Sequence, residues 1–270
     1  MIEHVHQRHA DRTNVKHLTP NGDAAIGSIR STATYELVVE QLRKAIYLGR
    51  FMPGDKLPPE RDLAKQLLVS RTTIREAIRV LEGEGLIAVR RGAAGGLVVL
   101  DQHRLKKAEI EVYMEAQRAL LDSLFEFRIA NECAAASLAA MRREQKHLTR
   151  MRKTLVEMDT LCATYESRAN MANIARFFAC DSEFHLAIAE ASMNHFLLEA
   201  VEQSRAAMFL PVGKVFTKLE DRANDHHRGI FQAIESQNSK LAAQRMKMHI
   251  EATRASLYNM MPKSAKSKRA

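Results

Sequence analysis

The segment 105–258 constrains the fold most, because it contains almost no glycine or proline over more than half of the 270-residue chain. Apolar residues recur in it at spacings of three and four, which is the period of an amphipathic helix. Such helices bury their apolar stripes against one another, so the segment is predicted to form an antiparallel all-α bundle of about six or seven helices. The expected helices lie at about 118–142, 145–165, 170–191, 194–210, 219–236 and 239–258, with breaks supplied by residues 211–213 and 236–238.

Residues 31–101 differ in texture, because short helical patterns alternate there with proline and glycine and end in two β-type runs. Gly49 stops the first helical pattern, and Ser70 is placed to cap the third at its N-terminus. The expected elements are helices at about 35–48, 60–68 and 71–82 and strands at 86–89 and 97–100. Three helices followed by a β-hairpin predict a winged helix-turn-helix. The chain is therefore expected to be mainly α, with domains at 31–101 and 105–258.

The ends of the chain and its composition narrow the partners and the compartment. Residues 1–30 carry four histidines and few periodic apolar positions, so a disordered arm is expected there, and residues 259–270 are expected to form a basic tail. The excess of 41 Lys and Arg over 32 Asp and Glu gives a net charge of +9, which favours a polyanionic partner. No apolar run approaches the ~18 residues that cross a membrane, and the first residues do not resemble a secretory signal. Three cysteines cannot pair evenly and suit a reducing compartment, so a cytoplasmic protein is expected.

The helix expected at 71–82 has two distinguishable faces. Its apolar residues recur at three- and four-residue spacing and are expected to pack inward: Ile74, Ala77, Ile78 and Leu81. Arg71, Arg75 and Arg79 lie four residues apart on the other side. A guanidinium group can bridge guanine O6 and N7, so this row suits the major groove of DNA. The alternative is a solvated helix face, in which these arginines pair with Glu76 and Glu82.

The first segment resembles the DNA-binding domain of the GntR family of bacterial transcription regulators. The resemblance is carried by PGDKLPPERDLA at 53–64, VSRTTIREA at 69–77 and LEGEGLI at 81–87. It implies a homodimer that binds double-stranded DNA at a near-palindromic operator, with Arg91 and Gly92 at the wing tip reaching the minor groove. The residues that the resemblance assigns to DNA contact or its support are Arg61, Arg71, Thr72, Thr73, Arg75, Arg91 and Gly92.

The second segment holds a candidate metal centre. Asp181 and His185 lie four residues apart on the apolar stripe of one predicted helix, so both can hold one cation. His227 and His249 lie on the last two predicted helices. One carboxylate and three imidazoles from facing helices form a plausible set of ligands for a divalent transition metal. From the residues alone, an Asp181–His185 pair of this kind is more often a hydrogen-bonded core pair or a surface salt bridge, and His226 and His227 could equally begin a helix in solvent.

Arg128 is a candidate effector-binding residue. It continues the apolar stripe of Leu121, Leu124 and Phe125, so its guanidinium group is expected to point inward. A buried guanidinium group needs an anion, and its planar fork suits a carboxylate. Glu132, one turn later, could neutralise it internally, and the carboxylate of a bound organic acid could do so as well. The sequence leaves both open.

The bundle segment resembles the FCD domain of the FadR-type subfamily. The resemblance is carried by LFEFRIANE at 124–132, DSEFH at 181–185, ASMN at 191–194, HRGIFQAI at 227–234 and the Met246–His249 spacing. It implies that Asp181, His185, His227 and His249 bind a divalent metal ion beneath a pocket for a small carboxylate effector. The metal could be Zn, Ni or Mn, because imidazole and carboxylate ligands do not select between them. Arg128 and Asn194 are assigned to the effector. Asn131 departs from the usual apolar residue and puts the shape of the pocket near it in doubt.

These features predict a ligand-responsive transcription factor, which is most often a repressor in this family. Effector binding in the bundle would change how the two DNA-binding domains of a dimer are spaced. The alternative is a metal-dependent hydrolase fused to a DNA-binding domain, because three histidines and a carboxylate with an open position could activate water. No further carboxylate or histidine at motif spacing offers a general base, and no nucleophile, phosphate-loop or HExxH motif is present. The chain is therefore not expected to be an enzyme.

Overall fold

The structure is a computed structural model. It describes residues 33–92, 95–101, 109, 112, 115–216, 218–220 and 222–259. The arm predicted at 1–30 and all but the first residue of the basic tail predicted at 259–270 lie outside the described residues.

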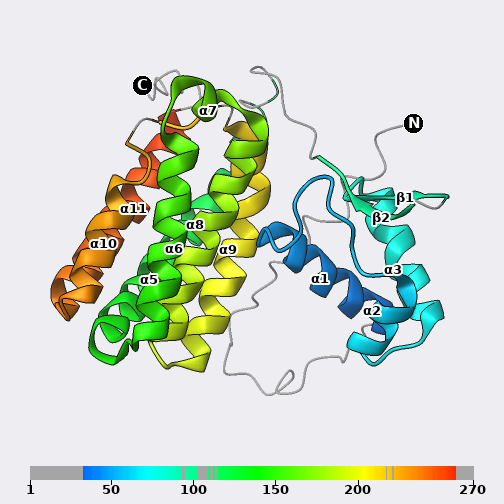
Figure 1. Ribbon diagram of the computed structural model, residues 1–270, viewed down its shortest axis with the longest axis horizontal. Helices are drawn as coiled ribbons and strands as arrows, with labels where there is room; N and C mark the ends of the chain where they lie inside the picture. The colour runs from blue at the N-terminus through cyan, green and yellow to red at the C-terminus, as the bar shows by residue number, and fades with distance from the viewer. Residues whose placement is uncertain are drawn as a thin grey trace, which may run out of the picture. The chain divides into compact units, whose positions relative to one another are not determined.

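The N-terminal elements form a winged helix-turn-helix, as the sequence predicts (Figure 1). They are α1 (Thr34–Tyr47), α2 (Glu60–Gln66), α3 (Arg71–Gly83), β1 (Ile87–Arg90) and β2 (Gly96–Val99). The two strands pair antiparallel, with Ile87 opposite Val99 and Arg90 opposite Gly96. Ser70 caps α3, because its Oγ accepts a hydrogen bond of 3.1 Å from the backbone N–H of Thr73.

The core of this part is built by α3 and the elements around it. The side chains of Ile74, Ala77 and Leu81 are fully buried, which confirms the inward apolar face of α3. Leu68, in the turn between α2 and α3, has a φ of 54° and is 91% exposed. A left-handed backbone costs a leucine conformational energy, and the exposed side chain regains nothing by packing.

The C-terminal elements form an all-α bundle, drawn in green through red in Figure 1. Seven helices within the described residues compose it: α5 (Arg118–Arg142), α6 (Gln145–Cys162), α7 (Tyr165–Ala169), α8 (Met171–Ala191), α9 (His195–Val215), α10 (Asp225–Glu235) and α11 (Ser239–Asn259). Helix α5 packs against α8, α9 and α11, while α6 packs on α8 and α10 on α11. Ala136, Ala139 and Ala140 of α5 are fully buried, because small side chains let neighbouring helices approach closely.

Three helix boundaries differ from the sequence prediction. A separate short helix, α7, follows α6, since Thr164 Oγ1 accepts a hydrogen bond from Ser167 N and starts a new turn. The break expected at 211–213 is wrong, because α9 continues through Pro211 to Val215. Helix α10 begins at Asp225 rather than at 219, since Asn224 is buried and donates to Leu155 O and Asp159 Oδ1 instead of extending the helix.

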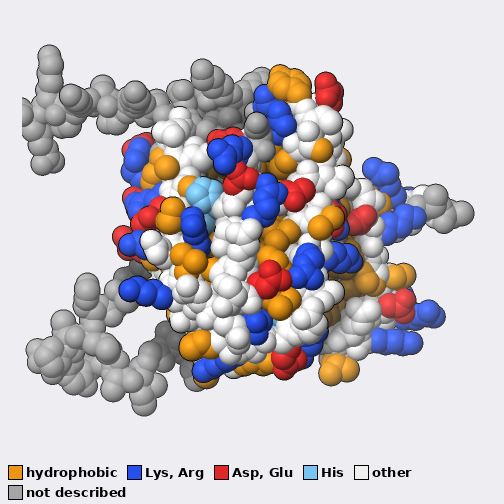
Figure 2. All heavy atoms as spheres, turned by 60° about the vertical axis from the view of Figure 1, so that its left-hand side comes forward, with side chains coloured by type: hydrophobic (Ala, Val, Ile, Leu, Met, Phe, Trp, Pro, Cys, Tyr) orange, Lys and Arg blue, Asp and Glu red, His pale blue; other side chains and the backbone are white. Residues whose placement is uncertain are grey.

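One face of the protein is mixed in charge. On the face drawn in Figure 2, Lys and Arg side chains (blue) are interspersed with Asp and Glu (red), and hydrophobic side chains occur between them. This face therefore differs from the one-sided basic stripe of a nucleic-acid contact. Within the described residues, no helix combines the length and apolar character needed to cross a membrane.

Candidate metal centre and DNA-reading face

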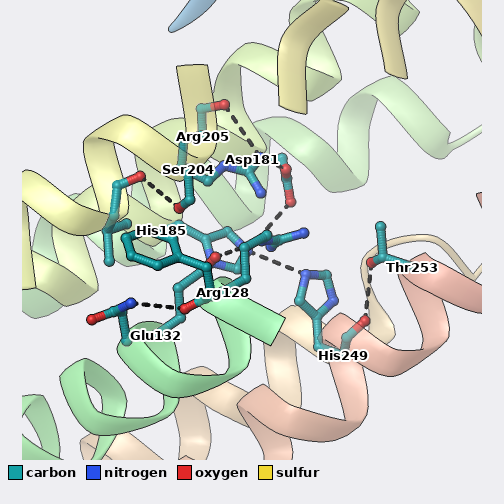
Figure 3. A network of polar contacts seen from close by, with 12 residues as sticks. Arg128, Glu132, Asp181, His185, Ser204, Arg205, His249 and Thr253 are labelled. Carbon is teal, nitrogen blue, oxygen red and sulfur yellow. Dashed lines mark hydrogen bonds and ion pairs between the residues drawn. The ribbon is translucent and has the colours of Figure 1, made fainter. Parts of the chain in front are cut away.

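Four side chains from three helices meet inside the bundle. Asp181 and His185 lie one turn apart on α8, His227 lies on α10 and His249 lies on α11. All four are buried, and one ligand atom of each lies within 4.8 Å of the others. Figure 3 shows His185 and His249 close to Asp181 at the centre of this cluster. The structure therefore brings together the complete set that the sequence singled out.

The spacing of these atoms fits a single transition-metal ion. Bonds of about 2.1 Å place neighbouring ligand atoms about 3.0 Å apart around an octahedral ion and about 3.4 Å apart around a tetrahedral one. His227 Nε2 lies 2.8 Å from Asp181 Oδ1. His185 Nε2 lies 3.2 Å from His249 Nε2 and 3.6 Å from Asp181 Oδ1. Small shifts of these side chains are enough to surround one ion.

The electrostatics of the cluster keep its imidazoles available to a metal. Burial lowers the pKa of His227 and His249 well below the ordinary value, and the neighbouring positive charges act in the same direction. Both rings are therefore neutral at pH 7 and keep a lone pair for coordination. Behind His185, Glu132 Oε2 contacts the Nδ1 atom. A carboxylate in that place favours the tautomer that leaves Nε2 free to coordinate an ion.

Arg128 is fully buried on α5, as its apolar stripe predicts. Its Nε donates a 2.5 Å hydrogen bond to Glu132 Oε1, so the internal pairing that the sequence left open is present. Burial alone would raise the pKa of Glu132, but the charge of the Arg128 guanidinium group and the hydrogen bonds to Glu132 outweigh it and hold that pKa well below its ordinary value. Arg128 Nη1 and Nη2 have no hydrogen-bond partner within the described residues.

Sequence reasoning missed a second buried arginine in this cluster. Arg205 lies on α9, and its Nη2 contacts Asp181 Oδ2 and lies 3.2 Å from Ser182 Oγ (Figure 3). The signal was present in the sequence: Arg205 lies four residues after Val201 and three before Met208, so it interrupts the buried stripe of α9 as Arg128 interrupts that of α5.

A cavity of about 610 Å³ opens onto the cluster. Arg128, Arg205 and three of the four candidate metal ligands line it, all except His185. Apolar side chains such as Phe177 and Met208 form much of the remaining wall. A volume of this size is typical of a site for a small molecule, and its few convergent polar groups lie on one side.

The structure also places three residues that the sequence left uncertain. His226 is exposed while His227 is buried, so the phase of α10 selects His227 for the cluster. Asn194 does not line the cavity: its Oδ1 accepts a hydrogen bond from Leu197 N at the start of α9, which is the role of a helix cap. Asn131 does not line the cavity either, because its side chain donates to Phe127 O of its own helix.

The arginine row of α3 lies on the surface. Arg71, Arg75 and Arg79 are all exposed, opposite the buried face of the helix. Neither Glu76 nor Glu82 pairs with them in the ion pairs of the described residues. Instead, Glu60 at the start of α2 accepts a 2.9 Å hydrogen bond from Arg75 Nε, and its Oε2 lies 3.9 Å from Arg71 Nη2.

The other predicted DNA-contact residues surround this row. Thr72 is exposed and Thr73 half-buried in the first turn of α3, and Arg61 on α2 has 72% of its side chain exposed. Arg91 and Gly92 follow β1 and are exposed, and Gly92 has a φ of 99°, a conformation that favours glycine. The predicted set therefore lies on accessible parts of α2, α3 and the wing.

Comparison with known proteins agrees with these features. Residues 34–96 match the family described as bacterial regulatory proteins, gntR family, and residues 123–252 match the FCD domain. The Uxu operon transcriptional regulator of Escherichia coli (strain K12) is 29% identical over 226 residues, which cover 80% of this chain and 84% of that protein. The HTH-type transcriptional regulator LutR of Bacillus subtilis (strain 168) is 28% identical over 215 residues, which cover 75% of this chain and 91% of that protein.

A solved structure has the same fold. E. coli McbR/YncC superposes with a TM-score of 0.52 over 84% of this chain and 98% of that protein, at 18% sequence identity. The two family matches together cover both the winged helix-turn-helix and the helical bundle. The chain is therefore a transcriptional regulator of the GntR family, with a DNA-binding helix-turn-helix domain followed by an FCD domain.

Proposed function

We propose that this regulator is a homodimeric repressor whose affinity for a near-palindromic operator is controlled by a small carboxylate effector, bound over a divalent metal ion in the bundle. Residues 31–101 form its DNA-binding domain and residues 105–258 its effector domain. The observation that carries the proposal is the buried Asp181, His185, His227 and His249 cluster at the floor of a 610 Å³ cavity. Two buried guanidinium groups, those of Arg128 and Arg205, line the same cavity, which gives an acid its counter-charges.

In this proposal, Arg71 and Arg75 contact bases or phosphates in the major groove, with Thr72 and Thr73 beside them. Arg91 and Gly92 reach the minor groove. The exposure of the α3 arginines supports this assignment, since a side chain must leave the protein surface to reach a base edge. Two copies of α3 in a dimer would then contact two half-sites about one helical turn apart.

The bound metal, Zn, Ni or Mn, would supply a Lewis-acidic centre that attracts a carboxylate. The chain's own residues do the rest: Asp181 and the three histidines hold the ion, Glu132 orients His185, and Arg128 offers two free N–H groups to the acid. The effector controls transcription only through a difference in affinity between the DNA-competent and DNA-incompetent arrangements of the dimer.

Catalysis is not part of this proposal. The two buried carboxylates of the cluster are each engaged by an arginine, Asp181 by Arg205 and Glu132 by Arg128. The pKa of Glu132 is held well below its ordinary value, so Glu132 is a poor general base, and one oxygen of Asp181 is occupied by Arg205. We therefore expect an effector to be recovered chemically unchanged after incubation with the protein.

The DNA assignment is tested by operator binding of Arg71→Ala and Arg75→Ala, measured by fluorescence anisotropy on an operator selected with the wild type. Each variant is expected to bind about 5- to 100-fold more weakly, as the loss of one base or phosphate contact implies. Arg152→Ala, which removes an exposed arginine of the bundle, is the matched control and is expected to bind like the wild type. Unchanged operator affinity in both α3 variants would remove the assignment.

The metal assignment is tested by elemental analysis of the full chain purified without a histidine tag. One divalent ion per chain is expected in the wild type and none in His185→Ala. The control is His195→Ala, because His195 is exposed at the start of α9 and pairs with Glu199 away from the cluster. A wild-type protein that holds no ion after incubation with Zn²⁺, Ni²⁺ or Mn²⁺ would refute the metal site.

A further inference from the structure

The cavity contains a second buried cation to which the proposed function gives no role. Arg205 has 6% of its side chain exposed and lines the cavity from α9, while Arg128 lines it from α5. Arg205 Nε and both terminal nitrogens of Arg128 have no hydrogen-bond partner among the described residues. A buried guanidinium group with unpaired N–H groups requires a hydrogen-bond acceptor. The described residues supply none for these three nitrogen atoms, so a bound anion is the expected acceptor.

Arg205 and a metal ion use different atoms of Asp181. Arg205 Nη2 contacts Oδ2, whereas Oδ1 faces the histidines, 2.8 Å from His227 Nε2 and 3.6 Å from His185 Nε2. An ion bound among the histidines therefore takes Oδ1 and leaves the contact between Arg205 and Oδ2 intact. The positive charge of Arg205 accordingly stays in the cavity wall when the ion is present.

The buried charges in and directly behind the cavity wall then set the charge of the ligand. Arg128 and Arg205 contribute +2, Glu132 and Asp181 contribute −2, and ligating histidines are neutral. A divalent ion raises the total to +2. An uncompensated buried charge is costly, so the loaded cavity favours a ligand with two negative charges over a ligand with one.

The proximity of the two guanidinium groups supports this count. Arg128 and Arg205 are both buried, and both line the same cavity. Two cations that repel each other across one cavity are both stabilised by an anion placed between them.

We propose that the cavity selects a dicarboxylate over a monocarboxylate, and that Arg205 is the residue that sets this preference. The inference rests on the proposed function and narrows its effector class from an organic acid to a dianionic one. The metal ion and the guanidinium groups of Arg128 and Arg205 would together bind the two carboxylates of the ligand. The other two arginines at the cavity, Arg222 and Arg245, are exposed, so water screens them and they discriminate weakly.

The test compares diacids with their monoamides, which keep the shape and remove one charge. The probes are malonate, succinate and glutarate, each paired with malonamate, succinamate or glutaramate, titrated calorimetrically into the full-length Zn²⁺-loaded protein. At least one diacid is expected to bind about 10- to 100-fold more tightly than its monoamide, as one lost charged hydrogen bond implies. Equal affinity within every pair, or no binding of any diacid, overturns the proposal.

Three variants identify Arg205 as the source of the preference. Arg205→Gln is expected to bring the diacid and its monoamide to similar affinity, while Arg205→Lys, which keeps the charge, retains part of the preference. Arg245→Gln is the matched control at the same cavity and is expected to change affinity a few-fold at most. Zinc content and the circular dichroism spectrum of each variant show that the ion and the fold are retained. An Arg205→Gln protein that binds zinc and keeps the full preference would refute the role of Arg205.

The two levels of the proposal fail in different ways. The proposed function fails when no divalent ion binds, or when no carboxylate changes operator affinity. The dicarboxylate preference fails by itself when monoamides or monocarboxylates bind the zinc-loaded protein and change operator affinity, and the corresponding diacids bind no more tightly.

Discussion

Replacing Glu132 by glutamine removes one charge from a fully buried ion pair and keeps the shape of the side chain. Glu132 is 1% exposed, accepts a 2.5 Å hydrogen bond from Arg128 Nε and contacts His185 Nδ1. In the variant, the Arg128 charge has no anion beside it in the bundle interior. Breaking one partner of a buried pair lowers the free energy of unfolding by about 3–5 kcal/mol, out of a total of about 5–15 kcal/mol.

The assay is urea unfolding of the metal-free full chain, followed by circular dichroism. Glu235→Gln is the matched control, because Glu235 pairs with Arg152 at the surface, where the side chains are 43% and 51% exposed. Exposed pairs of this kind contribute about 0–1 kcal/mol, so the control is expected to unfold close to the wild type. Combining Glu132→Gln with Arg128→Met removes both charges and is expected to regain part of the lost stability.

The reasoning would be refuted by a Glu132→Gln protein whose free energy of unfolding matches that of Glu235→Gln. Such a result would mean that Arg128 finds another anion or reaches water in the folded state. A double variant less stable than Glu132→Gln alone would show instead that packing of the Arg128 side chain, rather than its charge, dominates.

Three further predictions follow from single features of the structure. Because the folded-state pKa of Glu132 lies below its ordinary value of 4.5, ionised Glu132 contributes fully to the free energy of unfolding above that pH, and the contribution is lost as the pH falls. The difference in free energy of unfolding between wild type and Glu132→Gln should therefore shrink in acid, and a constant difference would contradict this. Leu68→Gly should raise the free energy of unfolding by up to about 1 kcal/mol, because glycine adopts a φ of 54° without strain, whereas Leu67→Gly, at the end of α2 where φ is −93°, should lower it. Equal losses of stability in both variants would count against strain at Leu68. Burial raises the pKa of the Cys133 and Cys162 thiols to about 11 and that of Cys180 to about 12. A thiolate-specific disulfide reagent should therefore label the folded protein slowly at pH 8 and the urea-unfolded protein quickly, and rapid labelling of the folded protein would contradict this.

The fold was predictable because its strongest signals are local. The inward face of α3 and the Ser70 cap follow from spacing and residue type, and the structure confirms both. One boundary failed because it depends on a tertiary contact. Asn224 ends the connection before α10 by bonding to α6, and no local pattern reports that partner. Pro211 was expected to break α9 because a helix interior disfavours proline, but α9 continues past it.

The candidate site was predictable where a polar residue interrupts an apolar stripe. Asp181, His185 and Arg128 were found in this way, and the phase of α10 then selects His227 over His226. Arg205 carries the same signal on α9, but the acidic residue at helical spacing from it is Glu202, three residues earlier, which does not point to the cluster. Its partner, Asp181, is 24 residues away in the chain, a distance over which sequence alone does not report contact.

The contact between Glu60 and Arg75 means that this protein arrives at DNA with part of its reading surface already occupied by an anion of its own. To engage a nucleotide in the proposed complex, Arg75 must exchange that carboxylate for a phosphate or a base edge. Fewer counterions are then displaced from the double helix than the number of arginines at the interface suggests, because the charge of Arg75 is already neutralised by Glu60 before DNA binds. The affinity of the protein for DNA should therefore fall less steeply with added salt than the number of its exposed arginines implies.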